Sequence, residues 1–401
     1  MHDMTDENKQ IVWMIIPTFY PVVGGTQSQV LRLTKRLLSL GWDVRVITRQ
    51  HSFYHPQGLP AHEVVDGIQV QRIFSRGGKF GSLLFLLGGL VFLCRNGRGQ
   101  IYHAHDIGAA GWLAVICARL FGGSSLIKLR TGRKWYEQYL DGHFSRWQLM
   151  ALFRLVSQII IVNREVEDLL AGLGISAKHM IYLPNAVDVN HFHLVTDEIK
   201  FSLRRQFNIP LHSSVVCYVG RLSYLKGVDI LLNSWAQLPA EIRCHTILAL
   251  VGDGEERPVL EELIARLALK DSVILYGMQE NVRDYYWASD VFILPSRQEG
   301  LSNSMIEAMS CGLPVISSAT GGALDIVADG QNGWLFRNDQ PEHLCQILMR
   351  CLDERNLWQG MGEVSRHTII QLADVVSMDE KIQGIYYRLA RSPIECAGRA
   401  S

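Results

Sequence analysis

The stretch SRQEGLSNSMIEAMSCGLP, from Ser296 to Pro314, places two glutamates on a predicted turn from a strand into a helix. The preceding VFILP has the length and composition of a short buried strand, and the apolar residues that follow recur at helical spacing. Glu299 therefore falls in the loop, and Glu307 falls about two turns into the helix. Gly300 lets a ligand approach the backbone closely, and the free N–H groups of a first helical turn attract an anion. The turn is suited to a phosphate flanked by carboxylates that bind hydroxyl groups.

Taken alone, two glutamates at this spacing also fit an ordinary helix with one exposed and one capping carboxylate. A second motif argues for a ligand site. In VVCYVGRLSYLKGVDILLNSW, Arg221 and Lys226 bracket the loop that follows a predicted strand from Val215 to Val219. Ligands collect at the carboxyl ends of parallel strands, and two cations placed there can hold a diphosphate. If Arg221 and Lys226 are considered by themselves, the alternative is that both are solvated charges on the surface.

Further motifs accompany these two in a specific order. They are GRL and KG at Gly220 to Gly227, VGDGEE at Val251 to Glu256, GG at Gly321 and Gly322, and DGQNGWL at Asp329 to Leu335. With these motifs the chain resembles the retaining glycosyltransferases of family 4. The resemblance implies an α/β GT-B fold, in which two Rossmann-like domains face a central cleft and a C-terminal helix returns to the first domain.

The resemblance also implies how a nucleotide-diphosphate sugar is held, with a UDP-sugar expected ahead of GDP-mannose. Arg221 and Lys226 are expected to bind the diphosphate. Glu299 is expected to hold hydroxyl groups of the donor sugar, and Glu307 those of the ribose. The remaining contacts expected with the donor come from the backbone at Gly300, Leu301, Ser302, Gly277 and Met278, the last two near the base.

No DxD-type metal motif is evident in the sequence, so we expect neither a metal nor another cofactor. The charge of the leaving diphosphate is then neutralised by the protein's own preorganised cations and amides. The resemblance implies front-face attack by the acceptor hydroxyl, with the diphosphate as the base. The residues expected to be catalytic are His105, Glu299, Arg221 and Lys226.

The first half of the chain alternates predicted strands with helices, which indicates a mostly parallel sheet. IVWMIIP, from Ile11 to Pro17, precedes a turn at Gly24 and Gly25, a helix from near Thr26 and a strand from Val44 to Thr48. These glycines do not form GxGxxG, so a dehydrogenase-type dinucleotide site is not expected. In the family that the chain resembles, the corresponding loop closes on the donor from the acceptor side.

Two histidines follow each other on one side of a predicted strand in IYHAHDIG. A metal site would need a third ligand nearby, and a purely structural role, with one ring packed and one hydrogen-bonded, is a further alternative. The resemblance favours His105 as the residue that reaches across the cleft to the donor sugar. Asp106, which we expect to begin a helix, and Asn163, each at a strand end, are secondary candidates.

The turn PNAVD, from Pro184 to Asp188, resembles the family's PNGVD turn, with Ala186 where glycine is common. We predict three parts: an acceptor-side domain over 1–192, a nucleotide-sugar-binding domain over 193–375, and a final helix within 376–401. The polar segment 193–214 is predicted to be the linker.

Composition supports two domains, since 401 residues with 48% hydrophobic and 19% charged residues can form two ordinary cores. The eight cysteines are scattered without a CxxC pair, as is typical of a reducing cytosol, and they suggest no zinc site. MHDMTDENKQ shows no secretion signal. We therefore expect a cytoplasmic protein.

Charge is unevenly distributed, because residues 1–190 hold 20 Lys and Arg against 13 Asp and Glu. The apolar segment Gly81 to Cys94, which is too short to span a bilayer comfortably, is flanked by cations, and a second basic and aromatic segment runs from Arg130 to Trp147. Such a face attracts an anionic acceptor or the anionic inner surface of a membrane. A core helix flanked by solvated cations is the alternative. Nucleic acid is not expected as a partner, because no known binding module accompanies the charge. The flanking cations are Arg76, Lys79, Arg95 and Arg98.

Two other functions are compatible with the same fold. One is a catalytically silent binding subunit, but such subunits typically lack one of the two glutamates or one of the two cations, and all four are present. The other is a nucleotide-sugar epimerase or a phosphorylase, although the epimerase pattern lacks the turn with two glutamates. We expect a transferase whose acceptor is a polysaccharide or a lipid-linked glycan.

Overall fold

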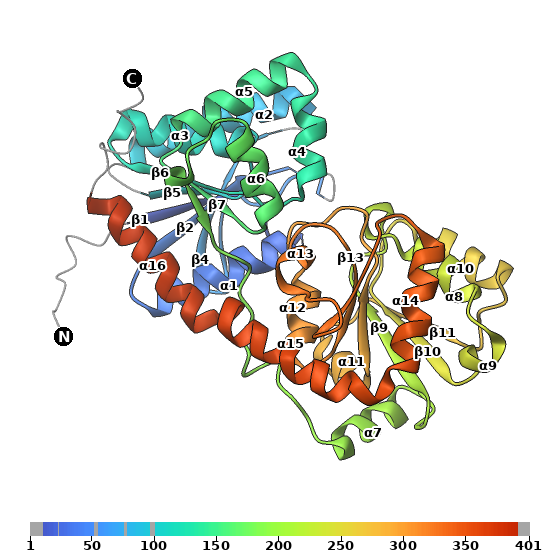
Figure 1. Cartoon of the computed structure of the whole chain (residues 1–401). Coiled ribbons are helices and arrows are strands. Elements are labelled where there is room, and N and C mark those ends of the chain that lie inside the picture. Colours follow the sequence, from blue (N-terminus) through green and yellow to red (C-terminus); the bar gives the residue numbers. More distant parts are fainter. Residues whose placement is uncertain (1–10, 23, 52–54, 76–77, 97–100, 392–401) are drawn as a thin grey trace. The chain divides into compact units, whose positions relative to one another are not determined.

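The computed structural model describes residues 11–22, 24–51, 55–75, 78–96 and 101–391. The chain forms two compact units, each an α/β structure built on a mostly or fully parallel sheet (Figure 1). The first unit comprises Met1–Leu183 and Val376–Ser401, and the second comprises Pro184–Val375. Among the described residues, the seven cysteines are all free thiols, and Cys396 lies outside those residues.

The first unit contains an eight-stranded sheet in the order β3-β4-β2-β1-β5-β6-β7-β8. All neighbouring strands are parallel except β3 and β4. Val12 to Ile15 are all buried, as expected for a parallel strand that is covered on both faces. The strands are β1 (Ile11–Ile15), β2 (Asp43–Arg49), β3 (His62–Val65), β4 (Ile68–Ile73), β5 (Ile101–Ala104), β6 (Ser124–Lys128), β7 (Gln158–Ile161) and β8 (Met180–Tyr182).

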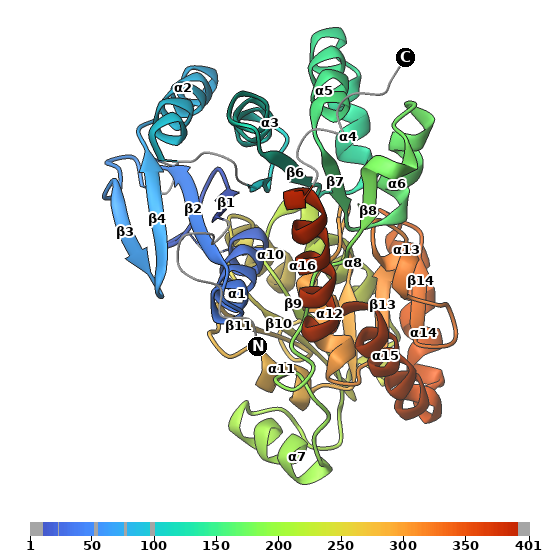
Figure 2. The same ribbon diagram turned by 90° about the vertical axis from the view of Figure 1, so that its left-hand side faces the viewer.

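Helices cover both faces of this sheet. Figure 2 shows α2, α3 and α5 in a row along one side, with α1 and α16 on the other. One hydrophobic core joins the sheet to α2, α3 and α5 through residues such as Phe85, Leu113 and Leu152. The helices are α1 (Gly25–Ser39), α2 (Gly78–Asn96), α3 (Ala109–Phe121), α4 (Arg133–Leu140), α5 (His143–Leu155), α6 (Arg164–Gly172) and α16 (Val375–Arg391), with a 3-10 turn η2 (Ala177–His179).

The last helix, α16, packs on the first unit, so the predicted return of the chain is confirmed. Arg36 in α1 forms an ion pair with Asp379 at 2.7 Å. The ring of Trp42 packs against the ring of Tyr386 with 5.5 Å between centroids. Ser124 Oγ donates a hydrogen bond of 2.9 Å to the carbonyl of Leu389.

The second unit contains a six-stranded, fully parallel sheet in the order β11-β10-β9-β12-β13-β14. Every residue of β9 and β10 is buried. The strands are β9 (Ser214–Val219), β10 (Thr246–Val251), β11 (Val273–Gly277), β12 (Val291–Leu294), β13 (Val315–Ser318) and β14 (Gly333–Phe336). The helices are α7 (Asp197–Gln206), α8 (Val228–Ala236), α9 (Ala240–Arg243), α10 (Arg257–Arg266), α11 (Arg283–Ala288), α12 (Asn303–Ser310), α13 (Ala323–Ile326), α14 (Pro341–Asp353) and α15 (Trp358–Ala373), with 3-10 turns η3 (Tyr224–Lys226) and η4 (Arg355–Leu357).

The boundary between the units lies at Leu183 and Pro184, nine residues before the predicted end of the first domain at 192. The reason is that the chain after Pro184 already packs on the second unit. Ser310 Oγ and Arg366 Nη1 both donate hydrogen bonds to the carbonyl of Phe192. The predicted boundary at 375 coincides with the end of the second unit.

The predicted linker 193–214 is wrong, because this segment contains α7, which belongs to the second unit. Lys200 and Arg204 of α7 both form ion pairs with Asp290, at 2.5 and 2.7 Å. The ring of Phe207 stacks on that of Tyr285 with 4.2 Å between centroids. The segment 193–214 is polar because its charged residues form these ion pairs. A sequence pattern alone does not distinguish paired charges from charges that are solvated in a linker.

The apolar segment Gly81 to Cys94 forms the centre of α2, which is longer than predicted, with 19 residues. Of the helices that the structure describes, α2 is the one long and apolar enough by length and composition to cross a membrane. It also contributes Phe85 and Leu93, both fully buried, to the core of the first unit. Arg76 and Arg98 lie outside the described residues.

Candidate functional site

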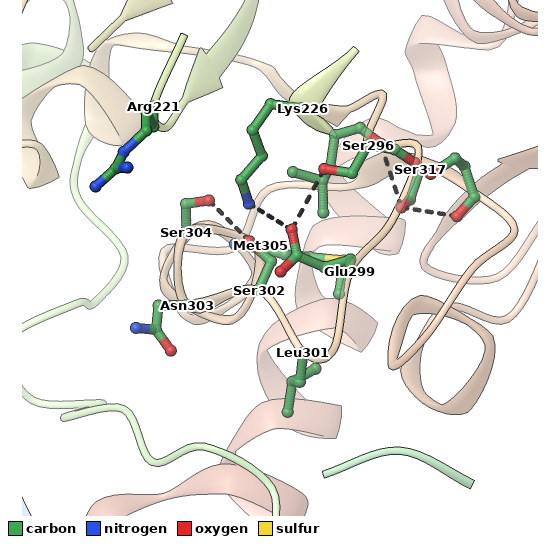
Figure 3. A network of polar contacts seen from close by, with 12 residues as sticks. Arg221, Lys226, Ser296, Glu299, Leu301, Ser302, Asn303, Ser304, Met305 and Ser317 are labelled. Carbon is green, nitrogen blue, oxygen red and sulfur yellow. Dashed lines mark hydrogen bonds and ion pairs between the residues drawn. The ribbon is translucent and has the colours of Figure 1, made fainter. Parts of the chain in front are cut away.

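Two loops meet at the carboxyl edge of the second sheet. β9 and β12 are parallel neighbours, so the loops that follow them leave the same edge. The first loop carries Arg221 and ends in η3 with Lys226, and the second carries Glu299 and enters α12. Figure 3 shows Arg221, Lys226 and Glu299 gathered around the start of α12.

Lys226 and Glu299 form a direct ion pair within this site. Lys226 Nζ lies 2.5 Å from Glu299 Oε2, and Ser296 Oγ donates a second hydrogen bond to the same oxygen at 3.3 Å (Figure 3). Both charged side chains are mostly buried, with 25% and 16% of their surfaces exposed. An ammonium has three donors, so this bond leaves Lys226 the capacity to bind phosphate oxygens as well.

The loop that carries Glu299 is tied to η3 by a residue that the sequence analysis missed. Arg297 forms two hydrogen bonds of 2.7 Å with Asp229 at the start of α8, and its guanidinium lies 4.1 Å from the ring centre of Tyr224. The hydrogen bonds that Arg297 donates to Asp229 raise the pKa of Arg297. This planar, two-pronged contact fixes orientation as well as distance. No local sequence signal identifies a pair that is 68 residues apart.

Two glycines allow the backbones around the pair to come close. Gly227 follows η3 with φ of +66°, and a Cβ there would lie 2.1 Å from the carbonyl oxygen of Pro295. Gly321 has φ of +57°, and its Cβ would lie 2.1 Å from the carbonyl oxygen of Glu299. Both positions therefore require glycine, which gives the KG and GG motifs a steric reason.

The start of α12 is capped by Ser302, whose Oγ accepts a hydrogen bond from the amide of Met305 at 3.4 Å. Ser302 is therefore the N-cap of this helix. Asn185 of the PNAVD turn, another residue that the sequence did not assign to the site, donates to Leu301 O and to Asn303 Oδ1 at 3.0 and 2.9 Å. The Asn185 amide thus holds the loop and the first turn of the helix together.

Glu307 is only 6% exposed. Tyr286, which is fully buried, donates a hydrogen bond from its hydroxyl to Glu307 Oε2 at 3.2 Å. Burial, and next the Glu307 charge, raise the pKa of Tyr286 well above its usual value. The alternative of one exposed and one capping glutamate is wrong, because Glu299 is paired with Lys226 and Glu307 is buried.

The remaining predicted donor contacts lie at the same sheet edge. Arg221 is exposed directly after β9, and its carbonyl accepts a hydrogen bond from Tyr218. Gly277 ends β11, with φ of +69°, and accepts a hydrogen bond from Gly252, while the next residue, Met278, is 81% exposed. β10 separates β11 from β9 in the sheet.

The structure places the other predicted residues in the first unit. Gly24 is the N-cap of α1 and Gly25 is its first residue, one position before the predicted start. Asp106 does not begin a helix, because α3 starts at Ala109. Its side chain instead accepts a hydrogen bond from the amide of Gly108. Asn163 is buried and caps α6 through the amide of Val166.

His103 and His105 stack in the interior of the first unit, with 4.3 Å between ring centres. His103 Nδ1 shares a hydrogen bond of 2.7 Å with the hydroxyl of Tyr386, and His105 Nε2 lies 3.5 Å from Met14 Sδ. Burial, and next the charge of Lys128, lower the pKa of His103 to about 3. Burial, and next His103, hold the pKa of His105 well below its usual value. Both rings are therefore neutral at pH 7, and the role expected of His105 stays a prediction.

The described residues contain no cluster of three or more His, Cys, Asp or Glu side chains that could hold a metal ion. The groups that the second unit does bring together are the cations Arg221 and Lys226, the carboxylate of Glu299 and the first turn of α12. Such an arrangement can bind an anion and polar hydroxyl groups side by side.

Comparison with known proteins identifies the family to which the chain belongs. Residues 23–191 match the model described as Glycosyltransferase Family 4, and residues 199–368 match that of the Glycosyl transferases group 1. The D-inositol 3-phosphate glycosyltransferase of Streptosporangium roseum is 26% identical over 366 residues, which cover 84% of this chain and 82% of that relative.

Solved structures agree in fold. Sucrose-phosphate synthase from Thermosynechococcus elongatus matches with a TM-score of 0.82 at 23% identity, covering 96% of this chain and all of that one. The HepE protein of Anabaena, solved in complex with UDP-glucose, matches with a TM-score of 0.75 at 20% identity, covering 94% and 99%. The chain belongs to the family 4 glycosyltransferases and has their GT-B fold.

Proposed function

We propose that the protein is a retaining glycosyltransferase that transfers a sugar from a nucleotide-diphosphate sugar to a glycan acceptor without a metal ion. The ion pair between Lys226 and Glu299 is the observation that carries this proposal. A cation suited to phosphate and a carboxylate suited to sugar hydroxyl groups lie 2.5 Å apart, beside the first turn of α12. The nucleotide-sugar donor joins these two chemical groups in one molecule.

Lys226 and Arg221 would bind the diphosphate and neutralise the charge that develops when it leaves. The amides at the start of α12 would add partial positive charge, because the first N–H groups of a helix have no partner within it. These donors are held in place before the reaction by the Arg297 contacts and by the Asn185 amide. Preorganised charge of this kind lowers the barrier without reorganisation during the reaction.

The reaction exchanges one bond at the anomeric carbon. The bond from this carbon to the diphosphate oxygen breaks, and a bond to the acceptor hydroxyl oxygen forms on the same face of the sugar. The proton of the acceptor hydroxyl passes to the departing diphosphate, which acts as the base. Glu299 would hold the hydroxyl groups of the sugar during this exchange, and Glu307 would bind the ribose.

A UDP-sugar is the donor that we favour. HepE, whose fold this chain shares, is known in complex with UDP and with UDP-glucose. The backbone at Gly277 and Met278, on the same sheet edge as Lys226, is available for contacts with the base. We propose a polysaccharide or a lipid-linked glycan as the acceptor and a cytoplasmic location, in keeping with the excess of cations over residues 1–190.

A screen of nucleotide sugars against the purified protein tests the proposal without knowledge of the acceptor. One sugar nucleotide should raise the unfolding temperature and undergo slow hydrolysis, and both effects should be lost in Lys226→Ala. Lys270→Ala, which removes an exposed cation of the same unit, is the matched control. Binding without turnover, even with acceptors present, would favour a silent subunit, and conversion of one nucleotide sugar into another would favour an epimerase.

A further inference from the structure

The helix α2 exposes a continuous apolar stripe. Phe80, Leu83, Leu87 and Val91 recur every three or four residues, and between 49% and 66% of each is accessible to solvent. This spacing places them on one side of the helix. We call these four residues the α2 stripe. Lys79 and Arg95, both exposed, lie at the two ends of the helix.

The opposite side of α2 is fixed in the core of the first unit. Phe85 and Leu93 are fully buried there. A Cβ on Gly88 would lie 2.7 Å from Ile73, and one on Gly89 would lie 2.5 Å from Leu113, so the helix packs closely on β4 and α3. Crossing a membrane would require α2 to leave this packing, whereas lying along a membrane surface would not.

The neighbouring helices on the same side of the sheet extend the apolar surface. Leu120 in α3 is 63% exposed, and Phe144 and Trp147 in α5 are 70% and 65% exposed. The rings of Phe144 and Trp147 stack on each other with 6.3 Å between centroids. Trp, whose ring carries an N–H group, is enriched where protein meets the lipid headgroups.

The charge of these three helices has one sign. Together α2, α3 and α5 contain no Asp or Glu, and they carry five Lys and Arg residues. They form a row along one side of the sheet (Figure 2). Apolar side chains bordered by cations, with no carboxylate among them, match the chemistry of an anionic lipid surface. The five cations are Lys79, Arg95, Arg119, Arg146 and Arg154.

We propose that the α2 stripe, with the cations and aromatic rings beside it, is a docking surface for an anionic membrane, on which α2 lies without crossing the bilayer. This inference does not rest on the donor or on catalysis. The docking proposal and the proposed function can therefore fail independently of each other. Attraction between exposed cations and anionic lipid is screened by salt, and a few inserted apolar side chains give reversible binding.

Vesicle flotation with the full chain tests the proposal. The protein should float with vesicles that contain phosphatidylglycerol, stay in the dense fraction with pure phosphatidylcholine, and be released at about 1 M NaCl, where charges are screened over about 3 Å. Replacing Lys79, Arg95, Arg146 and Arg154 by Gln should weaken partitioning by more than about 10²-fold. Flotation unchanged by salt and by these replacements would overturn the charge argument.

The apolar contribution needs its own variant. Leu83→Gln, Leu87→Gln and Val91→Gln together should abolish flotation, because Gln suits an exposed helix position and removes the inserted side chains. The matched control carries Val259→Gln, Leu357→Gln and Val364→Gln, exposed apolar residues of the second unit, and should float as the unmodified protein does. Hydrolysis of the donor and thermal unfolding should be unchanged in both variants.

Three further results would overturn the proposal. The first is the absence of flotation on phosphatidylglycerol vesicles at low salt. The second is protein that resists release by salt and alkaline washing, which would mean that α2 spans the bilayer. The third is that flotation is absent, the unmodified protein is a dimer in light scattering, and the triple Gln variant is a monomer. This result would mean that the α2 stripe binds a second copy of the chain.

Discussion

The hydroxyl of Tyr386 in α16 lies 2.7 Å from Nδ1 of His103 in β5, although 283 positions separate the two residues in sequence. Both side chains are fully buried. The ring of His103 in turn stacks on His105, the histidine that the family resemblance assigns to the donor sugar. The final helix therefore fixes the environment of His105 through a single intermediate residue.

Tyr386→Phe should destabilise the first unit and lower turnover. The change removes a buried hydrogen bond and leaves His103 Nδ1 without its partner, which costs about 1–3 kcal/mol. If His105 acts on the sugar, kcat should fall while the affinity for free nucleotide stays the same. Urea unfolding and calorimetry with the nucleotide measure the two effects. Tyr387→Phe, at an exposed neighbouring position, is the control, and equal effects from both variants would contradict the prediction.

Acid should destabilise the first unit through the buried histidines. The pKa of His103 is about 3 in the folded protein and near 6.5 in an unfolded chain. Between these values only the unfolded state takes up the proton, so stability is full above about pH 6.5 and declines as the pH falls toward 3, by about 1.4 kcal/mol per pH unit for one such group. His105, whose pKa is also lowered, acts in the same direction.

Urea unfolding at several pH values between 7.5 and 4 measures this dependence. His103→Gln removes one titrating group, so its stability should fall less steeply with acid than that of the unmodified protein. If stability fell with acid equally steeply in the two proteins, the pKa of His103 would not be lowered in the folded state, and the prediction would be wrong.

Much of this architecture could be predicted from the sequence because parallel strands are continuous apolar runs. The strands predicted from Val44 to Thr48 and from Val215 to Val219 agree with β2 and β9 to within one residue at each end. The ends of α2 were not, since Lys79 and Arg95 continue the helix beyond its apolar centre and carry no hydrophobic signal. The boundary at 183 depends on where Phe192 packs, which is a tertiary property.

The sequence could predict that Arg221, Lys226 and Glu299 belong to one site, but not the contacts within that site. Lys226 was expected to bind phosphate, and the family resemblance led us to expect Glu299 to hold the sugar; the structure pairs these two residues across 73 positions. Arg297 and Asn185, which hold the two loops, were missed because their partners are 68 and 116 positions away. Pattern and spacing inform on local structure, whereas these contacts arise only when the sheet brings separate loops to one edge.

The two cations should stabilise the leaving diphosphate. Arg221→Ala and Lys226→Ala should each weaken the binding of free nucleotide diphosphate and lower turnover by about 10²-fold or more, the scale of a lost contact to transition-state charge. Steady-state kinetics and calorimetry measure both effects, with Lys270→Ala as the matched surface control. Unchanged turnover in both site variants would reject the role in binding phosphate.

Removal of divalent metal should leave the activity intact. The charge of the diphosphate is assigned to Arg221, Lys226 and the amides of α12, and these groups do not depend on a bound ion. Initial rates before and after treatment with EDTA give the comparison. Loss of activity that returns on addition of Mn²⁺ or Mg²⁺ would show that a metal carries part of this charge.

The two glutamates should separate into a sugar contact and a nucleotide contact. Glu299→Gln should lower turnover and leave the affinity for free nucleotide nearly intact, because the contact proposed for Glu299 is with the sugar and the charge of Lys226 remains. Glu307→Gln should weaken the binding of free nucleotide, since the ribose belongs to donor and product alike. Tyr286→Phe distinguishes loss of the ribose contact from loss of packing, because it removes the hydrogen bond to Glu307 and keeps the carboxylate. Calorimetry with UDP decides between the roles: if Glu299→Gln lost nucleotide affinity and Glu307→Gln kept it, the two assignments would have to be exchanged.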